Sequence, residues 1–503
     1  MNKTIKLRNL FVLILIATLT SCFKDDTTLG TGVLSEILID SASVGKVHNM
    51  YQNETLQITP IVSQTNQEKE LTYTWEIDLK TYSHEKVFIY KGETLGSYHC
   101  RLIVENEDGK SFYPFIVHVN TPYEEGLTVI SKDADGKAML SFMMTPPDGS
   151  APTGFMQGDQ FFASNNQSFV DNPVDMVQSG GQLIIACQGS GDETSPATIY
   201  CLNEKTFLLE NLVTEPGFKD FKPTFLGIPA ITSPGRSYPI LCEGGHTYEF
   251  STTEGALSEA IKLPYTYAQT AIIYTKSGGY YDFLCWDKEL NALCLIYHGY
   301  PPYYCAKEYH TNRDSIVAQP SRNLFDGFDI CKMVLIEQTN DVLTTPKALV
   351  ITKNSSGMYQ KTLISVDFWE MVDGETKLVD GGGPQMCGFG QLSLTEATPC
   401  IANRTYSSLL FADANKIRRW NYASSSDMIT AAQELCSVGN SETAIITSMV
   451  LSSDHKKTYV AFYDPEQTEL NGSVWVIDTD NGTVLEQYDN VCYQPVKMIY
   501  KKK

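Results

Sequence analysis

TYVAF at residues 458–462 and SVWVID at 473–478, followed by NGTV at 481–484, decide the fold class of this chain. Both runs are rich in Val, Ile, Thr and aromatic residues, which favour half-buried strands. The Asn-Gly pair supplies two residues that tolerate positive φ, as a tight hairpin turn requires. Similar runs fill most of the chain, whereas long amphipathic helical patterns are missing from the sequence. The sequence therefore predicts an all-β protein.

Strand and turn recur from about residue 124 onward as a unit of roughly 35–55 residues, the length of a propeller blade. Turn signals at Asp135-Gly136 and Gly180-Gly181 separate two of the strand pairs. The closing run 495–500 is too short for a blade, and we expect it to pair with the first blade and close the ring. We predict a seven-bladed β-propeller at 123–503, with six or eight blades or a second set of stacked sandwiches as alternatives. The predicted blades are 126–168, 172–215, 221–263, 268–312, 327–376, 396–432 and 443–490.

Residues 34–122 predict a small separate β-sandwich. Its strands alternate apolar and polar residues, and the longest two are joined by Asp108-Gly109. Trp75 in a central strand, with Tyr98 two residues before Cys100, is the pattern of an immunoglobulin-like sandwich. The second Cys of that fold is missing, because no Cys lies between Cys22 and Cys100.

The first 21 residues predict a signal peptide, with a basic start, an apolar run at 10–17 and small residues before a cut site. That run of about 10 apolar residues is too short for a bilayer core, which takes about 20. Cys22, directly after Leu19-Thr20-Ser21, resembles the lipobox Cys of bacterial lipoproteins, which is acylated and becomes the new N-terminus. The alternative is an ordinary signal peptide with an unmodified Cys. We expect an outer-membrane lipid anchor on Cys22 and a tether at 22–33.

Lys24, Asp25 and Asp26 follow the expected anchor. They resemble the export signal that carries lipoproteins of SusC/SusD-type nutrient-uptake systems to the cell surface. The alternative is a solvated, charged tether. The sequence thus predicts a protein that faces the cell exterior.

Composition excludes one class of partner. The net charge of −21 becomes −24 when residues 1–21 are removed, because they hold three basic residues and no acidic ones. Such a chain is repelled by nucleic acid, so we expect no nucleic-acid partner. Twelve Cys remain besides Cys22, set singly in apolar runs without metal-site spacing. We expect buried thiols, with Cys285 and Cys294 as the best candidates for a disulfide across a hairpin.

No catalytic motif of a metalloprotease, serine hydrolase or phosphate-binding loop occurs in the sequence. The acidic turns at 133–136 and 478–482 fit hairpins better than calcium sites. We therefore expect no catalytic residues, no metal and no cofactor. The most ligand-like segment is 297–304, where Tyr rings could stack on a sugar or dock a peptide, unless the loop folds onto its own blade. Its candidate ligand-binding residues are Tyr297, Tyr300, Tyr303 and Tyr304.

The whole chain resembles the PKD-like family of surface lipoproteins. The resemblance rests on the lipobox, on Tyr73-Thr74-Trp75-Glu76 in the sandwich, and on the joint from 115–120 into 123–127. It implies an accessory subunit of a SusC/SusD-type, TonB-dependent outer-membrane importer. It carries no catalytic residues over to this chain.

Three functions follow as hypotheses. The first is a non-catalytic surface lipoprotein that binds oligosaccharide or oligopeptide nutrients for the importer. The second is a surface glycan hydrolase or lyase on a propeller, and the third is a subunit that only scaffolds the importer complex. The sequence does not decide between a glycan and a peptide ligand.

Overall fold

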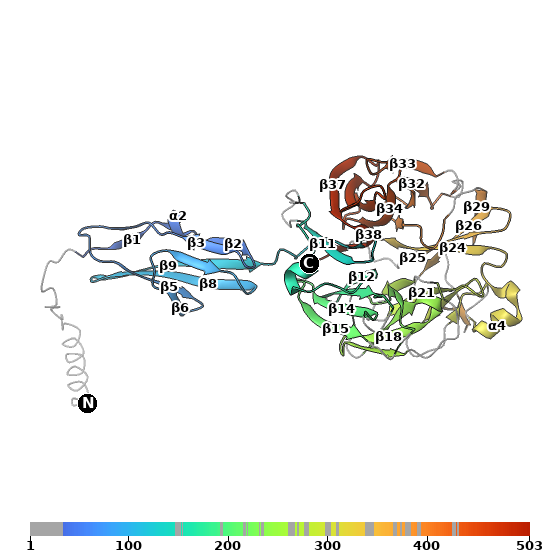
Figure 1. The fold of residues 1–503 in the computed structure, drawn as a ribbon, viewed down its shortest axis with the longest axis horizontal. Helices are drawn as coiled ribbons and strands as arrows, with labels where there is room; N and C mark the ends of the chain where they lie inside the picture. Colours follow the sequence, from blue (N-terminus) through green and yellow to red (C-terminus); the bar gives the residue numbers. More distant parts are fainter. Residues whose placement is uncertain are drawn as a thin grey trace, which may run out of the picture. The chain divides into compact units, whose positions relative to one another are not determined.

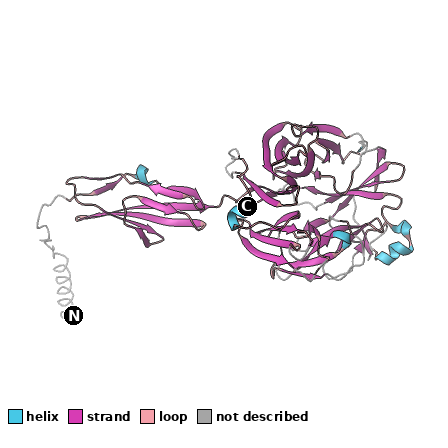
Figure 2. Cartoon of the chain, in the orientation of Figure 1, coloured by secondary structure: helices cyan, strands magenta, loops and turns pink. Residues whose placement is uncertain are grey.

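The computed structural model describes residues 34–145, 152, 154–191, 195–214, 218, 220–230, 232, 236–259, 267–268, 271–275, 281–296, 303–307, 311–337, 347–365, 370–372, 375–377, 384–389, 394–424, 429 and 432–503. These residues form strands almost throughout, and their α-helices are only four to six residues long (Figure 2). The prediction of an all-β protein is confirmed. The chain divides into two compact units between Thr121 and Pro122.

The first unit has one large sheet and two short strand pairs (Figure 1). The order of the large sheet is β2 (Val47–Tyr51), β9 (Gly109–Asn120), β8 (Gly96–Asn106), β5 (Thr72–Ile77) and β6 (Lys80–Ser83). Strand β2 runs parallel to β9, and the other neighbours are antiparallel. The short pairs are β1 (Ile37–Ile39) with β4 (Val62–Gln64) and β3 (Thr55–Ile58) with β7 (Phe88–Lys91), and helix α2 (Ser41–Val44) follows β1.

A single apolar core joins these sheets. Trp75 lies at its centre, fully buried, and its indole Nε1 donates a hydrogen bond to the Glu85 carbonyl at 2.8 Å. Its ring meets Phe115 edge to face, with 5.9 Å between the ring centroids. The Tyr98 hydroxyl donates to the backbone carbonyl of Thr94, four residues upstream, at 2.7 Å. The two aromatic residues that suggested a sandwich are therefore both part of its packing.

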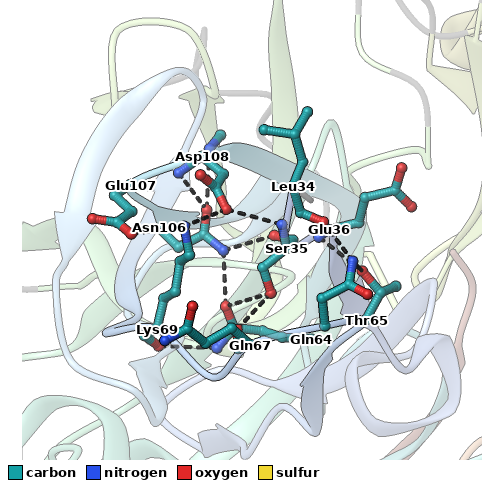
Figure 3. A network of polar contacts seen from close by, with 12 residues as sticks. Leu34, Ser35, Glu36, Gln64, Thr65, Gln67, Lys69, Asn106, Glu107 and Asp108 are labelled. Atoms are coloured by element: carbon teal, nitrogen blue, oxygen red, sulfur yellow. Dashed lines mark hydrogen bonds and ion pairs between the residues drawn. The ribbon is translucent and has the colours of Figure 1, made fainter. Parts of the chain in front are cut away.

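A polar network fixes the start of the first unit (Figure 3). The buried amide of Asn106 donates to the Ser35 carbonyl and to Gln64 Oε1, and its oxygen accepts from the backbone N–H groups of Asp108 and Gly109. Asp108 in turn accepts from the Ser35 N–H at 2.9 Å. One side chain thus ties the β8–β9 turn to the segment where the expected tether ends.

The second unit is a series of antiparallel strand groups (Figure 1). In the described residues these are β11 (Ala138–Met144), β10 (Gly126–Lys132) and β38 (Gln494–Lys501); β12 (Pro173–Ser179), β13 (Gln182–Cys187), β14 (Thr198–Asn203) and β15 (Leu209–Thr214); β16 (Pro223–Leu226), β17 (Ser237–Cys242), β18 (Thr247–Ser251) and β19 (Ala256–Glu259); β20 (Ile272–Thr275), β21 (Tyr281–Asp287), β22 (Ala292–Ile296) and β23 (Tyr303–Tyr304); β24 (Asp329–Glu337), β25 (Lys347–Lys353), β26 (Met358–Ser365) and β29 (Gln385–Phe389); β30 (Cys400–Asn403), β31 (Ser408–Asp413), β32 (Lys416–Asn421) and β33 (Gln433–Ser437); and β34 (Ile445–Leu451), β35 (Lys457–Tyr463), β36 (Gly472–Asp478) and β37 (Val484–Cys492). A short parallel pairing of β24 with β30 joins two of these groups into one sheet.

The strand groups form a closed series. Strand β38 at the C-terminus pairs antiparallel with β10, the first strand of the unit, from Tyr500 opposite Leu127 to Gln494 opposite Lys132. The expected pairing of the closing run is confirmed. Apolar clusters bridge neighbouring groups all along the series, and the last one joins Val474 and Tyr459 to Leu127 and Met143. Among the described residues, a series of sheets whose last strand pairs with the first is a propeller-like arrangement.

Three of the predicted segments end too early. The outer strands β29, β33 and β37 extend to Phe389, Ser437 and Cys492, beyond the predicted ends at 376, 432 and 490. In the first case an extra hairpin of β27 (Glu370–Val372) and β28 (Glu375–Lys377) separates β26 from its partner β29. An inserted hairpin resembles a blade strand in sequence, so the pattern by itself placed the boundary wrongly.

The cysteines are small buried residues, as expected. Of the twelve from Cys100 to Cys492, nine are buried, three are half-buried, and none is in a disulfide. Cys285 and Cys294 lie directly opposite each other on β21 and β22, as expected, but both are thiols here. Burial raises the pKa of the Cys285 thiol to about 12, so the reactive thiolate is disfavoured.

Candidate functional site

The second unit contains a cavity of about 700 Å³. It is lined by the strands that stand at the edges of their groups, namely β16, β20, β24, β30, β34 and β38. Four of these strands, β16, β20, β34 and β38, are edge strands of their sheets, whereas β24 and β30 pair with each other where two groups join. The cavity wall combines aliphatic side chains with polar ones, among them the hydroxyl groups of Thr447 and Ser448.

Lys332 is the most enclosed charged group of this cavity. It lies on β24 between apolar neighbours, and its Nζ donates to the Glu396 carbonyl at 2.5 Å. Burial lowers its pKa, the nearby Glu396 carboxylate raises it in part, and the charge of Lys497 lowers it. The Glu396 carboxylate forms an ion pair with Lys288 at 3.1 Å. The enclosed cation is therefore held by a backbone carbonyl, while the adjacent carboxylate is engaged by another lysine.

Lys497 ties three strand groups together at the cavity wall. Its Nζ on β38 lies 3.0 Å from Oδ1 of Asp175 on β12, and that carboxyl group is almost fully buried. The other oxygen, Oδ2, accepts a hydrogen bond from the Leu226 N–H at the end of β16, at 2.8 Å. A buried carboxylate with a cation and a backbone donor is well compensated.

His455 and Lys502 lie at another part of the lining. His455 is 4% exposed, in the turn between β34 and β35, and its Nδ1 has no hydrogen-bond partner among the described residues. Burial lowers its pKa; the charge of Lys502 lowers it further, and that of Asp454 raises it. His455 is therefore neutral near pH 7.

The structure corrects one residue of the tyrosine segment. Tyr304 is fully buried, and its hydroxyl donates to the buried Asp287 carboxylate at 2.7 Å. Asp287 also accepts from Arg313 Nε at 3.1 Å, so the Tyr304 ring forms part of a polar brace inside the fourth group. It is not available to a ligand, because burial and the hydrogen bond hold it in the core.

Of the other predicted site residues, the structure describes only Tyr303. Tyr303 lies in β23, whose backbone pairs with β22 despite the preceding prolines. Tyr297, Tyr300, Cys22, Lys24, Asp25 and Asp26 lie outside the described residues.

Sequence reasoning missed the cavity lysines. A signal for them existed, because Lys332 interrupts the apolar run 330–336 and Lys497 interrupts 495–500. A lysine within a buried strand needs a carbonyl or carboxylate partner, or a cavity. Which strands border a common cavity is set by the order of the groups, and the sequence pattern does not contain that.

The acidic turns serve as turns. Asp133 Oδ1 accepts from the backbone N–H groups of Asp135 and Lys137, and Asp478 Oδ1 does the same for Asp480 and Asn481. Within the described ranges, no group of three His, Cys, Asp or Glu side chains is placed to hold a metal ion. The same part of the chain contains no helix of the length and apolarity that a membrane crossing requires.

No protein-family model and no curated protein matches this chain. Among solved structures, it is similar to a quinonprotein alcohol dehydrogenase-like protein from Bacteroides thetaiotaomicron, with 15% identity, TM-score 0.43 and coverage of 93% of this chain and 99% of that one. It is also similar to a DUF4784 family protein from Bacteroides caccae, with 9% identity, TM-score 0.31 and coverage of 91% and 96%. Apo AztD from Citrobacter koseri has 10% identity, TM-score 0.33 and coverage of 86% and 100%. TM-scores below 0.5 do not establish a shared fold, so the sheet arrangement described above stands on this structure itself.

Proposed function

We propose that this protein is a non-catalytic surface lipoprotein that binds a nutrient in the cavity of its second unit for a SusC/SusD-type importer. The observation that carries the proposal is the cavity itself. Its volume of about 700 Å³ lies within the range of about 300–1,000 Å³ that is usual for small-ligand sites. A short oligosaccharide or oligopeptide fits that size class.

The architecture proposed with this function is an immunoglobulin-like sandwich of the PKD-like kind followed by a seven-bladed propeller. Support for the sandwich comes from the buried Trp75 and from the bond between the Tyr98 hydroxyl and Thr94. Support for seven blades comes from the seven strand groups among the described residues and from the return of β38 to β10.

Anchoring completes the proposal. Acylation of Cys22 attaches the mature chain to outer-membrane lipid, and Lys24, Asp25 and Asp26 direct it to the cell surface. The tether at 22–33 then leads to the Asn106 network at the start of the first unit. The net charge of −24 after cleavage of residues 1–21 keeps nucleic acid from being a partner.

Binding is favoured over hydrolysis by the state of the carboxylates near the cavity. Glycoside hydrolysis uses two carboxyl groups that act as acid and as base or nucleophile. Glu396 is ion-paired with Lys288, and Asp175 is ion-paired with Lys497 and accepts a backbone N–H. Both groups are thus held by structural partners.

The test is a panel of neutral and acidic oligosaccharides and oligopeptides, titrated into the purified mature protein by calorimetry. The same mixtures are then analysed by chromatography for products. We expect binding without turnover, and chemical cross-linking on cells should recover importer subunits. Product formation would instead establish the hydrolase or lyase alternative. Cross-linking to the importer without binding of any ligand would establish the scaffolding alternative.

A further inference from the structure

We propose that the cavity selects a small ligand that carries a carboxylate, and that Lys332, Lys497 and Lys502 bind it. This inference rests on the proposed function and names the chemical class of its ligand. Both acidic sugars and acidic peptides offer this group, and the experiment below distinguishes them.

The lining of the cavity carries a positive formal charge. Three lysines and one glutamate line the cavity, and His455 is neutral, so the lining has a formal charge of 3 − 1 = +2. The full chain has a net charge of −21. The cavity lining is thus positive, although the protein as a whole is negative. Such a lining attracts anions, whereas the outer surface repels them.

The lysines have hydrogen-bond donors that the described residues do not engage. An ammonium group has three donors. Lys332 directs one of them to the Glu396 carbonyl, and Lys497 directs one to Asp175, with 38% of the Lys497 side chain still exposed. The remaining donors of both groups can be satisfied by the two oxygens of a carboxylate.

Cations on separate strands border the same cavity. Lys332 on β24 and Lys497 on β38 both line it, and the charge of Lys497 lowers the pKa of Lys332. Lys502, beyond the end of β38, acts on His455 in the same way. Like charges at short range repel each other, and an anion placed between them relieves that repulsion.

The remaining wall suits the rest of such a ligand. Aliphatic side chains alternate with the hydroxyl groups of Thr398, Thr447 and Ser448. A surface of this kind contacts the ring face and hydroxyls of a sugar, or the backbone of a dipeptide, while the carboxylate is bound by the lysines.

The experiment titrates the mature protein with four probes in two matched pairs: digalacturonate with its neutral counterpart digalactose, and Glu-Glu with Gln-Gln. We expect one acidic probe to bind at least about ten times more tightly than its neutral partner, and its affinity to fall as NaCl is raised from 50 to 500 mM. The pair that shows the difference identifies the source of the carboxylate as sugar or peptide.

The variant K332Q/K502Q removes two of the cations without leaving Asp175 unpaired, and it should abolish the preference for the acidic probe. K332R/K502R should restore it, and K416Q, which removes the exposed ion pair of Lys416 on β32 with Glu434 on β33, should leave it unchanged. Melting temperatures identify any variant that fails to fold, and in that case the K332R/K502R comparison and the salt dependence decide.

Equal affinity for the two members of both pairs overturns this inference but leaves the proposed function intact. Absence of binding by all four probes also overturns it, and the larger panel then decides the proposed function separately. Retention of the acidic preference by a folded K332Q/K502Q variant would show that the carboxylate lies elsewhere.

Discussion

At the scale of single residues, the closing strand contains a lysine in an unusual position. Lys501 is 1% exposed, and its Nζ donates to the Glu124 carbonyl at 2.6 Å. Burial lowers its pKa from 10.5 to about 8, a change that corresponds to roughly 3 kcal/mol against the charged form. At pH 7, burial of the charged Lys501 therefore lowers the stability of the folded chain, at the strand that pairs with β10.

We expect Lys501→Met to raise the melting temperature at pH 7, because the apolar side chain avoids this cost. The parent protein should become more stable as the pH rises from 8 to 10.5, since its folded form releases a proton there that the unfolded chain still binds. The advantage of the variant should thus shrink by about 2 kcal/mol between pH 7 and pH 10. Thermal unfolding at both pH values tests this, with exposed Lys456→Met as the control. A constant advantage would contradict it.

His455 should make the folded protein less stable as the pH becomes acidic. Burial lowers its pKa below 6.5, so below that pH the unfolded chain binds a proton that the folded chain does not, and stability falls. The groups that act on it are Asp454 and Lys502. His455→Asn, which suits the local φ of 60°, should flatten the decline in melting temperature between pH 7.5 and 5.5. Exposed His246→Asn is the control, and an unchanged slope in His455→Asn would rule out this account.

At the scale of elements, each unit has one segment that connects parts of the chain far apart in sequence. In the first unit it is the β8–β9 turn, whose Asn106 connects to β4 and to the start of the chain. In the second unit it is β38, which lies between β10 and the cavity. Both act on segments that are far apart in sequence.

Asn106→Ala should destabilise the first unit by about 2 kcal/mol, because it leaves buried partners such as the Ser35 carbonyl without a donor. Hydrogen exchange of the β8 and β9 amides should accelerate accordingly, while that of the second unit should not change. Lys110→Ala, which removes an exposed ion pair in the same hairpin, serves as the control. Equal exchange in the two variants would mean that the network contributes nothing.

Deletion of 495–503 should open the series of sheets. It exposes the edge of β10 and removes Met498, which is fully buried, so we expect a loss of at least about 3 kcal/mol together with aggregation. Calorimetry and light scattering follow the two effects. Removal of only Lys502 and Lys503 is the control. A full deletion that melts like the parent would exclude ring closure by β38.

At the scale of the whole molecule, we expect the lipid to be the only attachment to the membrane. Cys22→Ala should leave the protein in the soluble periplasmic fraction, or retained with its signal peptide uncut. Replacement of Lys24, Asp25 and Asp26 by Ala should keep the lipid but hide the protein from protease added to intact cells. Cell fractionation and protease shaving measure both. Persistence of Cys22→Ala in the outer membrane would disprove lipid anchoring. Equal digestion of the parent and the triple-Ala variant by protease would show that Lys24, Asp25 and Asp26 are not the export signal.

The sequence alone determined the strand content and many of the turns. At Gly180-Gly181 both residues have positive φ and join β12 to β13, as the pattern predicts, and the turns at Asp108-Gly109, Asp135-Gly136 and Asn481-Gly482 also join paired strands. These features are local, because a turn needs only its own residues and alternation needs only one strand. The buried Trp75 was predictable for the same reason.

Only the tertiary structure decided which residues meet. Tyr304 was a candidate ligand-binding residue, with burial against its own blade as the alternative, and it is Asp287 on β21 that binds its hydroxyl in the core. Lys332 and Lys497 belong to strands more than 150 residues apart, and they share a cavity because the order of the strand groups brings β24 and β38 to the same wall. The order in which sheets pack depends on long-range burial of apolar surface, and that information is spread over the whole chain.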